Sequence, residues 1–123
     1  MNGEELLRRH CKNVGLDFDS TFYVKSSQVA LHPGKRIQQK CEINELDEVA
    51  YVVRYFPDDD IFFAWRYLRG RNSCSFKVPE DYSIQPGTVR KDTKTIGDGS
   101  GRKETVYSFF SKDINKFLEE VIL

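Results

Sequence analysis

Residues 49–67 read VAYVVRYFPDDDIFFAWRY and give the strongest strand signal in the sequence. It holds two apolar runs, 49–56 and 60–67, separated by Pro57, Asp58 and Asp59. β-branched and aromatic residues favour strands, and a Pro-Asp cluster between two such runs is typical of a hairpin turn. Both runs are apolar almost throughout instead of alternating. We therefore expect a central antiparallel hairpin that is covered on both faces.

Helical patterns lie at the two ends of the chain. Asn2 is a suitable N-cap, Gly15 is a suitable stop, and apolar residues recur at helical spacing between them. A second helix is predicted after Ser111, with that serine as its N-cap. Further strands are predicted at 21–25, 29–32, 73–78 and 104–110, and the pattern of 36–41 is ambiguous. Residues 79–103 are polar, and we expect one or two short strands there and a loop at 97–101.

This order of elements predicts an α+β fold. Strands and helices do not alternate, which argues against a parallel α/β sheet. The expected architecture is a mostly antiparallel curved sheet or a small open β-barrel, flanked by N- and C-terminal helices. The 123 residues fit one domain, 1–123, which is either complete or the N-terminal targeting module of a longer protein.

Composition narrows the class of protein. No run of about 18 apolar residues is present, so no membrane span is expected, and the first residues lack the pattern of a secretory signal. Cys11, Cys41 and Cys74 form no CxxC pair, which argues against a disulfide framework or a zinc knuckle. We expect a cytoplasmic protein without a metal or another cofactor.

The zero net charge hides an uneven distribution. Residues 42–60 carry seven acidic side chains and one basic, whereas residues 61–103 carry nine basic and four acidic. Such clustering allows one basic face to attract phosphate while another face stays acidic. Mixed charges on an ordinary solvated surface are the plainer interpretation.

Catalytic motifs are absent from the sequence. It contains no GxSxG, SxxK, HExxH, P-loop or helix-opening GxGxxG. A metal nuclease that uses Asp58, Asp92 and Lys94 is a weak alternative, because two carboxylates and a lysine suffice for that degenerate pattern. We expect no catalytic activity in this chain.

The candidate binding residues centre on 65–77, which reads WRYLRGRNSCSFK. Arginine binds phosphate or guanine through two hydrogen bonds, asparagine can read adenine, and aromatic rings offer faces to bases. The turn at 32–36, HPGKR, is a second basic element. The expected nucleic-acid-binding residues are Lys35, Arg36, Trp65, Arg66, Tyr67, Arg69, Arg71, Asn72, Ser75, Lys77, Arg90 and Lys91.

The stretch from Asp60 to Val78 resembles part of the small N-terminal β-domains of modification-dependent or site-specific restriction enzymes. In those domains an apolar strand ending in a pair such as Ala64-Trp65 leads into a basic loop and a Tyr/Ser-rich strand. A later Phe and a terminal helix close the domain, as Phe109, Phe110 and 112–122 would here. Such domains are similar to the B3-like or PUA-like DNA-reading modules attached to nucleases and McrB-type motors.

The resemblance implies a DNA-binding module of a restriction or antiviral defence system. Its expected partners are duplex DNA, with or without a modified base, and the other domains of a nuclease or AAA+ motor. The alternative is a protein–protein interaction domain that uses opposed acidic and basic faces. A salt-dependent affinity for nucleic acid distinguishes the two.

Overall fold

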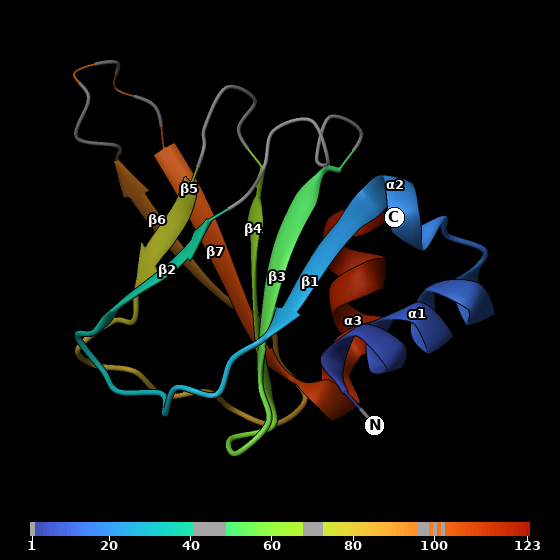
Figure 1. The fold of residues 1–123 in the computed structure, drawn as a ribbon, viewed down its shortest axis with the longest axis horizontal. Helices are drawn as coiled ribbons and strands as arrows, with labels where there is room; N and C mark the ends of the chain where they lie inside the picture. The colour runs from blue at the N-terminus through green and yellow to red at the C-terminus, as the bar shows by residue number, and fades with distance from the viewer. Residues whose placement is uncertain (1, 41–48, 68–72, 96–98, 100, 102) are drawn as a thin grey trace.

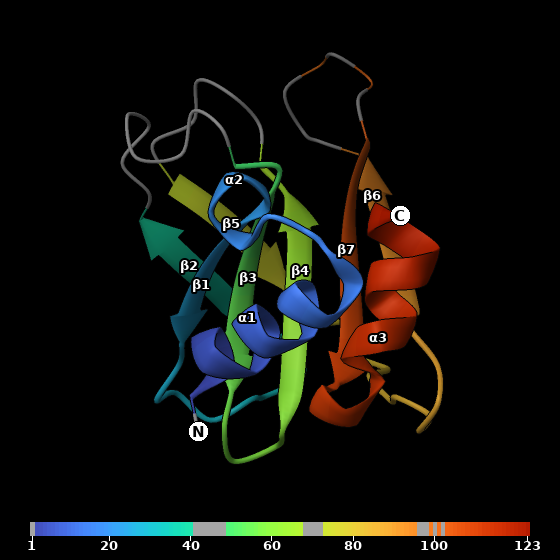
Figure 2. The same ribbon diagram turned by 90° about the vertical axis from the view of Figure 1, so that its right-hand side faces the viewer.

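The computed structural model describes residues 2–40, 49–67, 73–95, 99, 101 and 103–123. It has three layers, with a five-stranded sheet in the middle, helices on one face and a two-stranded sheet on the other (Figures 1 and 2). The predicted α+β class is confirmed. None of the helices in these residues is long and apolar enough to cross a membrane.

The helices and strands have the following bounds. The helical elements are α1 (Gly3–Val14), α2 (Phe18–Thr21), a 3₁₀ turn (Ser111–Asp113), α3 (Ile114–Phe117) and a π-helical turn (Leu118–Ile122). The strands are β1 (Phe22–Ser26), β2 (Arg36–Lys40), β3 (Tyr51–Phe56), β4 (Ile61–Arg66), β5 (Ser73–Lys77), β6 (Arg90–Thr95) and β7 (Lys103–Phe110). The central sheet has the order β1-β3-β4-β7-β6, and β2 pairs with β5 to form the smaller sheet.

The central hairpin is confirmed, because β3 and β4 pair antiparallel with Phe56 opposite Ile61. Its turn ends at Asp60, which has a positive φ of 56°. The carboxylate of Asp60 accepts hydrogen bonds of 2.6 Å from the hydroxyls of Tyr55 and Ser111. The predicted capping role of Ser111 is therefore wrong, since its side chain bonds to the hairpin turn and not to the helix that follows.

The pairing of β1 with β3 is parallel, which the sequence analysis did not anticipate. A parallel connection needs a dozen or more residues and is usually helical. Here residues 27–50 make the crossover, and they include β2 on the opposite face of the sheet from the helices. The other three strand pairs of the central sheet are antiparallel, so the sheet is mixed. Among the described strands it ends at β1 and β6, without closing into a barrel.

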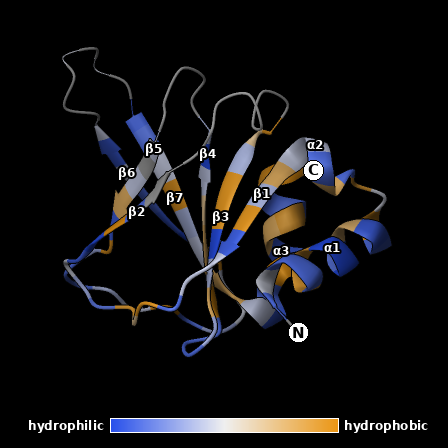
Figure 3. Cartoon of the chain, in the orientation of Figure 1, coloured by the Kyte–Doolittle hydropathy of each residue, from blue (hydrophilic) through white to orange (hydrophobic). Residues whose placement is uncertain are grey.

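Two other strand assignments also change. Residues 29–32 do not form a strand, and Val29 is exposed. Residues 90–95 form the edge strand β6, which was expected only as a short strand somewhere within 79–103. Figure 3 shows that β6 is largely hydrophilic, which explains why its sequence pattern is weak.

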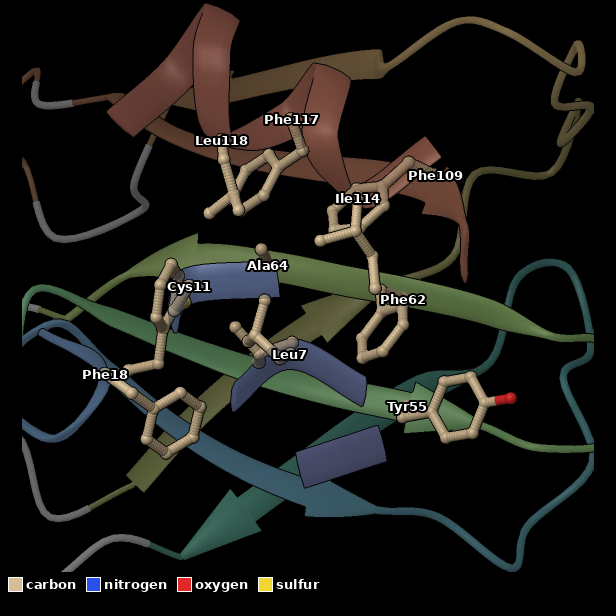
Figure 4. Packing of buried hydrophobic residues seen from close by; sticks show 12 residues of the cluster. Leu7, Cys11, Phe18, Tyr55, Phe62, Ala64, Phe109, Ile114, Phe117 and Leu118 are labelled. Atoms are coloured by element: carbon tan, nitrogen blue, oxygen red, sulfur yellow. The ribbon is translucent and has the colours of Figure 1, made fainter. Parts of the chain in front are cut away.

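Each face of the central hairpin is buried in its own hydrophobic cluster. Alternation along β4 sends Phe62 and Ala64 towards the helices, and Phe63 and Trp65 towards the smaller sheet. Figure 4 shows the helix-side cluster, in which Phe62 lies beside residues of α1 and of the C-terminal helical segment. The expectation that both runs are covered on both faces is confirmed.

The smaller sheet is held by apolar contacts and by a hydrogen bond from the half-buried Arg54. Ile37 and Phe76, which lie opposite each other in β2 and β5, are buried against the central sheet. Arg54 of β3 donates from NH1 to the carbonyl oxygen of Gln38 at 2.7 Å. Burial lowers the pKa of this guanidinium. The arginine thus fixes the position of β2 over β3.

The first helix follows the prediction closely. The side chain of Asn2 accepts from the backbone N–H of Glu5 at 2.8 Å, and Gly15 ends the helix with a φ of 75°. His10 Nδ1 lies 2.9 Å from the side-chain oxygen of Asn115, which joins α1 to α3. These contacts place α1 across the same face of the sheet as the C-terminal helical segment (Figure 2).

Cys11 of α1 is a free, fully buried thiol, and it provides a test of this packing. Burial raises the pKa of Cys11 from 9.0 to about 11, while the charge of Arg8 opposes the shift. Because folding raises the pKa of Cys11, the protonated thiol stabilises the folded state fully below pH 9. This stabilisation is lost as pH rises towards 11. The free energy of unfolding should fall by about 1 kcal/mol through this thiol between about pH 8 and pH 10.

The measurement is urea denaturation at several pH values for the wild type and Cys11→Ala. The variant should lack the part of the pH dependence that the thiol contributes, whatever its stability at neutral pH. Equal pH slopes for the two proteins would show that Cys11 titrates as an exposed thiol does.

Candidate nucleic-acid interface

A groove of about 290 Å³ runs between the smaller sheet and the outer strands of the central sheet. It forms where these layers separate, because β5 pairs only with β2 and β6 pairs only with β7 among the described strands. Its floor contains Phe63 and Phe76, whose ring centroids lie 4.7 Å apart. The residues that line it come from β2, β4, β5, β6 and β7 and from Pro79 after β5.

Among the residues that the structure describes, three cations reach this groove from three different strands. They are Arg36 of β2, Lys77 of β5 and Lys94 of β6, and all three are exposed. Arg36 donates from NH1 to the hydroxyl of Ser75 at 3.2 Å, which orients its guanidinium. We call the site formed by Arg36, Ser75, Lys77 and Lys94 the basic groove.

Two carboxylates among the described residues also line the basic groove. Asp92 receives hydrogen bonds from Arg90, with an Nε to Oδ2 distance of 3.0 Å. The second carboxylate is that of Glu104 in β7. Lys77 lies 3.8 Å from Glu80 in an exposed pair, and pairs of this kind contribute little to stability. The lysine ammonium group therefore stays accessible to an external anion.

The structure brings together only part of the expected binding set. Arg36, Ser75 and Lys77 share the groove, and Lys35 is exposed just before β2. Arg66 and Lys91 lie on the other face of the central sheet, since their register partners Tyr51 and Tyr107 face the helices. Arg69, Arg71 and Asn72 lie outside the described residues.

Two aromatic residues expected to contact a base are instead part of the core. Trp65 is 5% exposed, and its ring centroid is 4.9 Å from that of Phe76. Tyr67 is 9% exposed and belongs to the same cluster. A base cannot stack on either ring face while these side chains keep their packing. The apolar sequence that places β4 in the centre of the sheet also places Trp65 in the core.

Arg90, another expected binding residue, is held by contacts within the chain. It is bound to Asp92, donates from NH1 to the carbonyl oxygen of Ser83 at 2.8 Å, and lies over the ring of Tyr82. Hydrogen bonds to Asp92 and Ser83 thus use most of the N–H donors of Arg90. The sequence shows the positive charge of Arg90. It does not show that the carboxylate of Asp92, two positions along on the same face of β6, binds that charge.

Lys94 was missing from the expected binding set, although its position could have been inferred. In β6 the residues Arg90, Asp92 and Lys94 share one face, because side chains alternate along a strand. The strand itself was only loosely predicted, so this face was not identified. Thr95 next to it also lines the basic groove.

The residues of the metal-nuclease alternative do not form a cation site. Asp58 lies at the exposed turn between β3 and β4, whereas Asp92 is held by Arg90 in β6. Within the described part of the chain, no three His, Cys, Asp or Glu residues are grouped so that they could hold a metal ion.

Comparison with protein-family models, with curated proteins and with solved structures finds no match to this chain.

Proposed function

We propose that this chain binds DNA, with a phosphodiester backbone lying along the basic groove. The observation that carries the proposal is the convergence of Arg36, Lys77 and Lys94, which are distant in sequence, on one groove. Arginine and lysine at such positions bind phosphate oxygens and release counterions from the nucleic acid. The hydroxyl of Ser75 accepts from Arg36 and can itself donate to a phosphate oxygen or a base edge.

The placement of two of these cations favours an external anion. Arg36 and Lys77 are register partners across the β2–β5 pair, so two positive side chains stand directly opposite each other. Like charges at opposed positions of antiparallel strands are destabilising. A bound phosphate removes that repulsion. Arg36 and Lys77 therefore contribute to binding, although their pairing does not contribute to folding.

The proposal extends to a targeting module of a restriction or defence system, with the nuclease or motor activity located in another domain. The support for this extension is the resemblance of residues 60–78 to the N-terminal β-domains of restriction enzymes. In this view the central sheet and the smaller sheet are the two walls of a small open barrel, and the basic groove is its opening. Recognition of a modified base would then be a property of the same face.

The test is fluorescence anisotropy with a labelled duplex, methylated or not, and with a single strand of the same length. Salt is varied from about 50 to about 200 mM. The variant is Arg36→Ala/Lys77→Ala/Lys94→Ala. Since each lost phosphate contact lowers the salt slope of duplex binding by about 0.9, the slope should fall by roughly 2 to 3. The affinity at low salt should fall by roughly 100-fold.

A matched control removes three exposed cations elsewhere. Arg9 and Lys12 lie on α1, and Lys112 lies in the 3₁₀ turn after β7. Replacing these three with alanine changes the net charge by the same amount but leaves the basic groove intact, so the affinity should change by less than about threefold because distant charges are screened. Equal losses in the two triple variants, or no binding by the wild type at low salt, would contradict the proposal.

A protein–protein interaction domain is the second candidate function. Asp58 and Asp59 are exposed at the β3–β4 turn, at the bottom of Figure 1, and give the molecule an acidic end separate from the basic groove. Head-to-tail contact between these two surfaces predicts self-association that weakens with salt. Sedimentation velocity at low and high salt, together with Asp58→Asn/Asp59→Asn, tests it. A salt-independent monomer excludes this mode of association.

A further inference from the structure

The central sheet divides near one end, between β4 and β7. Their pairing ends at Trp65 and Val106, whereas β4 stays paired with β3 as far as Arg66 and β7 stays paired with β6 as far as Lys103. Figures 1 and 2 both show the two strands moving apart beyond this point. A cavity of about 320 Å³ lies there, and we call it the β4–β7 fork.

Trp65 forms one wall of the β4–β7 fork. Its indole ring is 5% exposed and packs against Phe76 on the side of the smaller sheet. A ligand in the cavity would therefore change the surroundings of this ring.

The remaining walls combine phenol rings with positive charge. Tyr51 and Tyr107 line the β4–β7 fork together with Arg66, Lys103 and Thr105. Burial raises the pKa of Tyr51, and the proximity of Tyr107 adds to the shift while Arg66 opposes it. The Tyr51 phenol therefore stays neutral at physiological pH and can donate a hydrogen bond. Glu104 is the one acidic residue among the described lining, against two cations.

This set of groups defines the chemistry of the ligand. It needs a flat apolar part for the phenol rings and an anionic group for the two cations. The volume is within the range of small-molecule sites. Glu104 also lines the basic groove, so the two cavities adjoin through one residue.

We propose that the β4–β7 fork binds a nucleoside monophosphate unit, either free or as part of a strand. The base lies against the phenol rings, and the phosphate binds Arg66 and Lys103. The assignment of a nucleotide, and not another aromatic anion, rests on the proposed function of the adjoining basic groove.

Trp65 is the only tryptophan of the chain, so its emission reports directly on the β4–β7 fork. The probes are the four deoxynucleoside monophosphates, with deoxyribose 5-phosphate and inorganic phosphate as controls that lack a base. At least one nucleotide should change the emission in a saturable way, and the two controls should not. Arg66→Gln should weaken that binding by about tenfold, which corresponds to about 1.4 kcal/mol.

The matched control variant is Lys25→Gln, which removes an exposed cation on β1 outside the cavity. It should bind nucleotides as the wild type does. No saturable change with any nucleotide, or equal effects of Arg66→Gln and Lys25→Gln, would overturn the proposal.

A short single strand separates the two sources of the ligand. If the unit belongs to a strand, an oligonucleotide should change Trp65 emission at lower concentration than a mononucleotide, and the triple variant of the basic groove should abolish that advantage. If the unit is free, mononucleotides should bind the triple variant and the wild type equally well. Salt-dependent DNA binding without any change in Trp65 emission would overturn the inference about the β4–β7 fork while leaving the proposed function intact. Nucleotide binding without any DNA binding would overturn the proposed function while leaving the inference about the β4–β7 fork intact.

Discussion

Replacing Phe63 with alanine is expected to lower the free energy of unfolding by about 3–5 kcal/mol. Phe63 is fully buried in β4, on the face that the smaller sheet covers. Its ring centroid lies 4.7 Å from that of Phe76, 5.5 Å from that of Phe56 and 5.7 Å from that of Tyr82. It therefore joins the central hairpin to β5 and to the segment before β6, and its loss leaves a cavity between two layers.

Urea denaturation measures this effect through the transition midpoint and the m value. Val29→Ala is the matched control, because Val29 is 44% exposed and should change stability by less than about 0.5 kcal/mol. If Phe63→Ala is too unstable to purify, Phe63→Leu keeps most of the apolar volume and should cost appreciably less. A loss below about 1 kcal/mol for Phe63→Ala would show that the smaller sheet is not packed on the central one.

Gly3→Ala should destabilise the protein by about 1–3 kcal/mol, although alanine is the better helix former. Gly3 begins α1 and is buried against β3. A Cβ built on it comes within 2.7 Å of Cγ of Tyr55 and also meets Cβ of the same residue. Tyr55 cannot retreat easily, because its hydroxyl is bonded to Asp60 and its ring lies 4.5 Å from that of Phe62.

The control for helix propensity is Asn13→Ala in the same helix. Asn13 is exposed, so this change should leave stability unchanged or raise it by a few tenths of a kcal/mol. Opposite signs for the two alanine substitutions, measured by urea denaturation, are the expected result. Stabilisation by Gly3→Ala would mean that the start of α1 does not lie against Tyr55.

The two tests examine the layers on which the candidate sites depend. Phe63 lies in the floor of the basic groove, so its packing sets the distance between the strands that carry Arg36 and Lys94. Gly3 lets α1 approach β3 on the helix side of the sheet. A protein that passes both tests has the framework from which the DNA-binding and nucleotide-binding proposals start.

Local sequence patterns were sufficient where neighbouring residues in the chain determine the structure. The α1 helix was predicted from its cap at Asn2, its stop at Gly15 and the spacing of its apolar residues. The β3–β4 hairpin was predicted from two adjacent apolar runs around Pro57. These elements form through contacts between residues close in sequence, and such contacts leave a readable period or turn signal.

The candidate sites could be predicted only in part, because side chains distant in sequence create them. The sequence predicted Arg36, Ser75 and Lys77 as candidate binding residues, and the structure places them in one groove. The sequence did not show that Lys94 joins them or that Asp92 neutralises Arg90. It offered Trp65 as a base-contacting residue, whereas the β2–β5 sheet buries that ring.

Sequence patterns predicted the α+β class, the central hairpin, the first helix and the separation of acidic from basic segments. They did not predict the parallel β1–β3 pair, the place of β6 at the sheet edge, or which cations meet in the basic groove. These features depend on strand order and layer packing, and both depend on contacts between residues far apart in the chain. Charge along the sequence shows which groups are available, and only the packing of the layers shows which of them face one another.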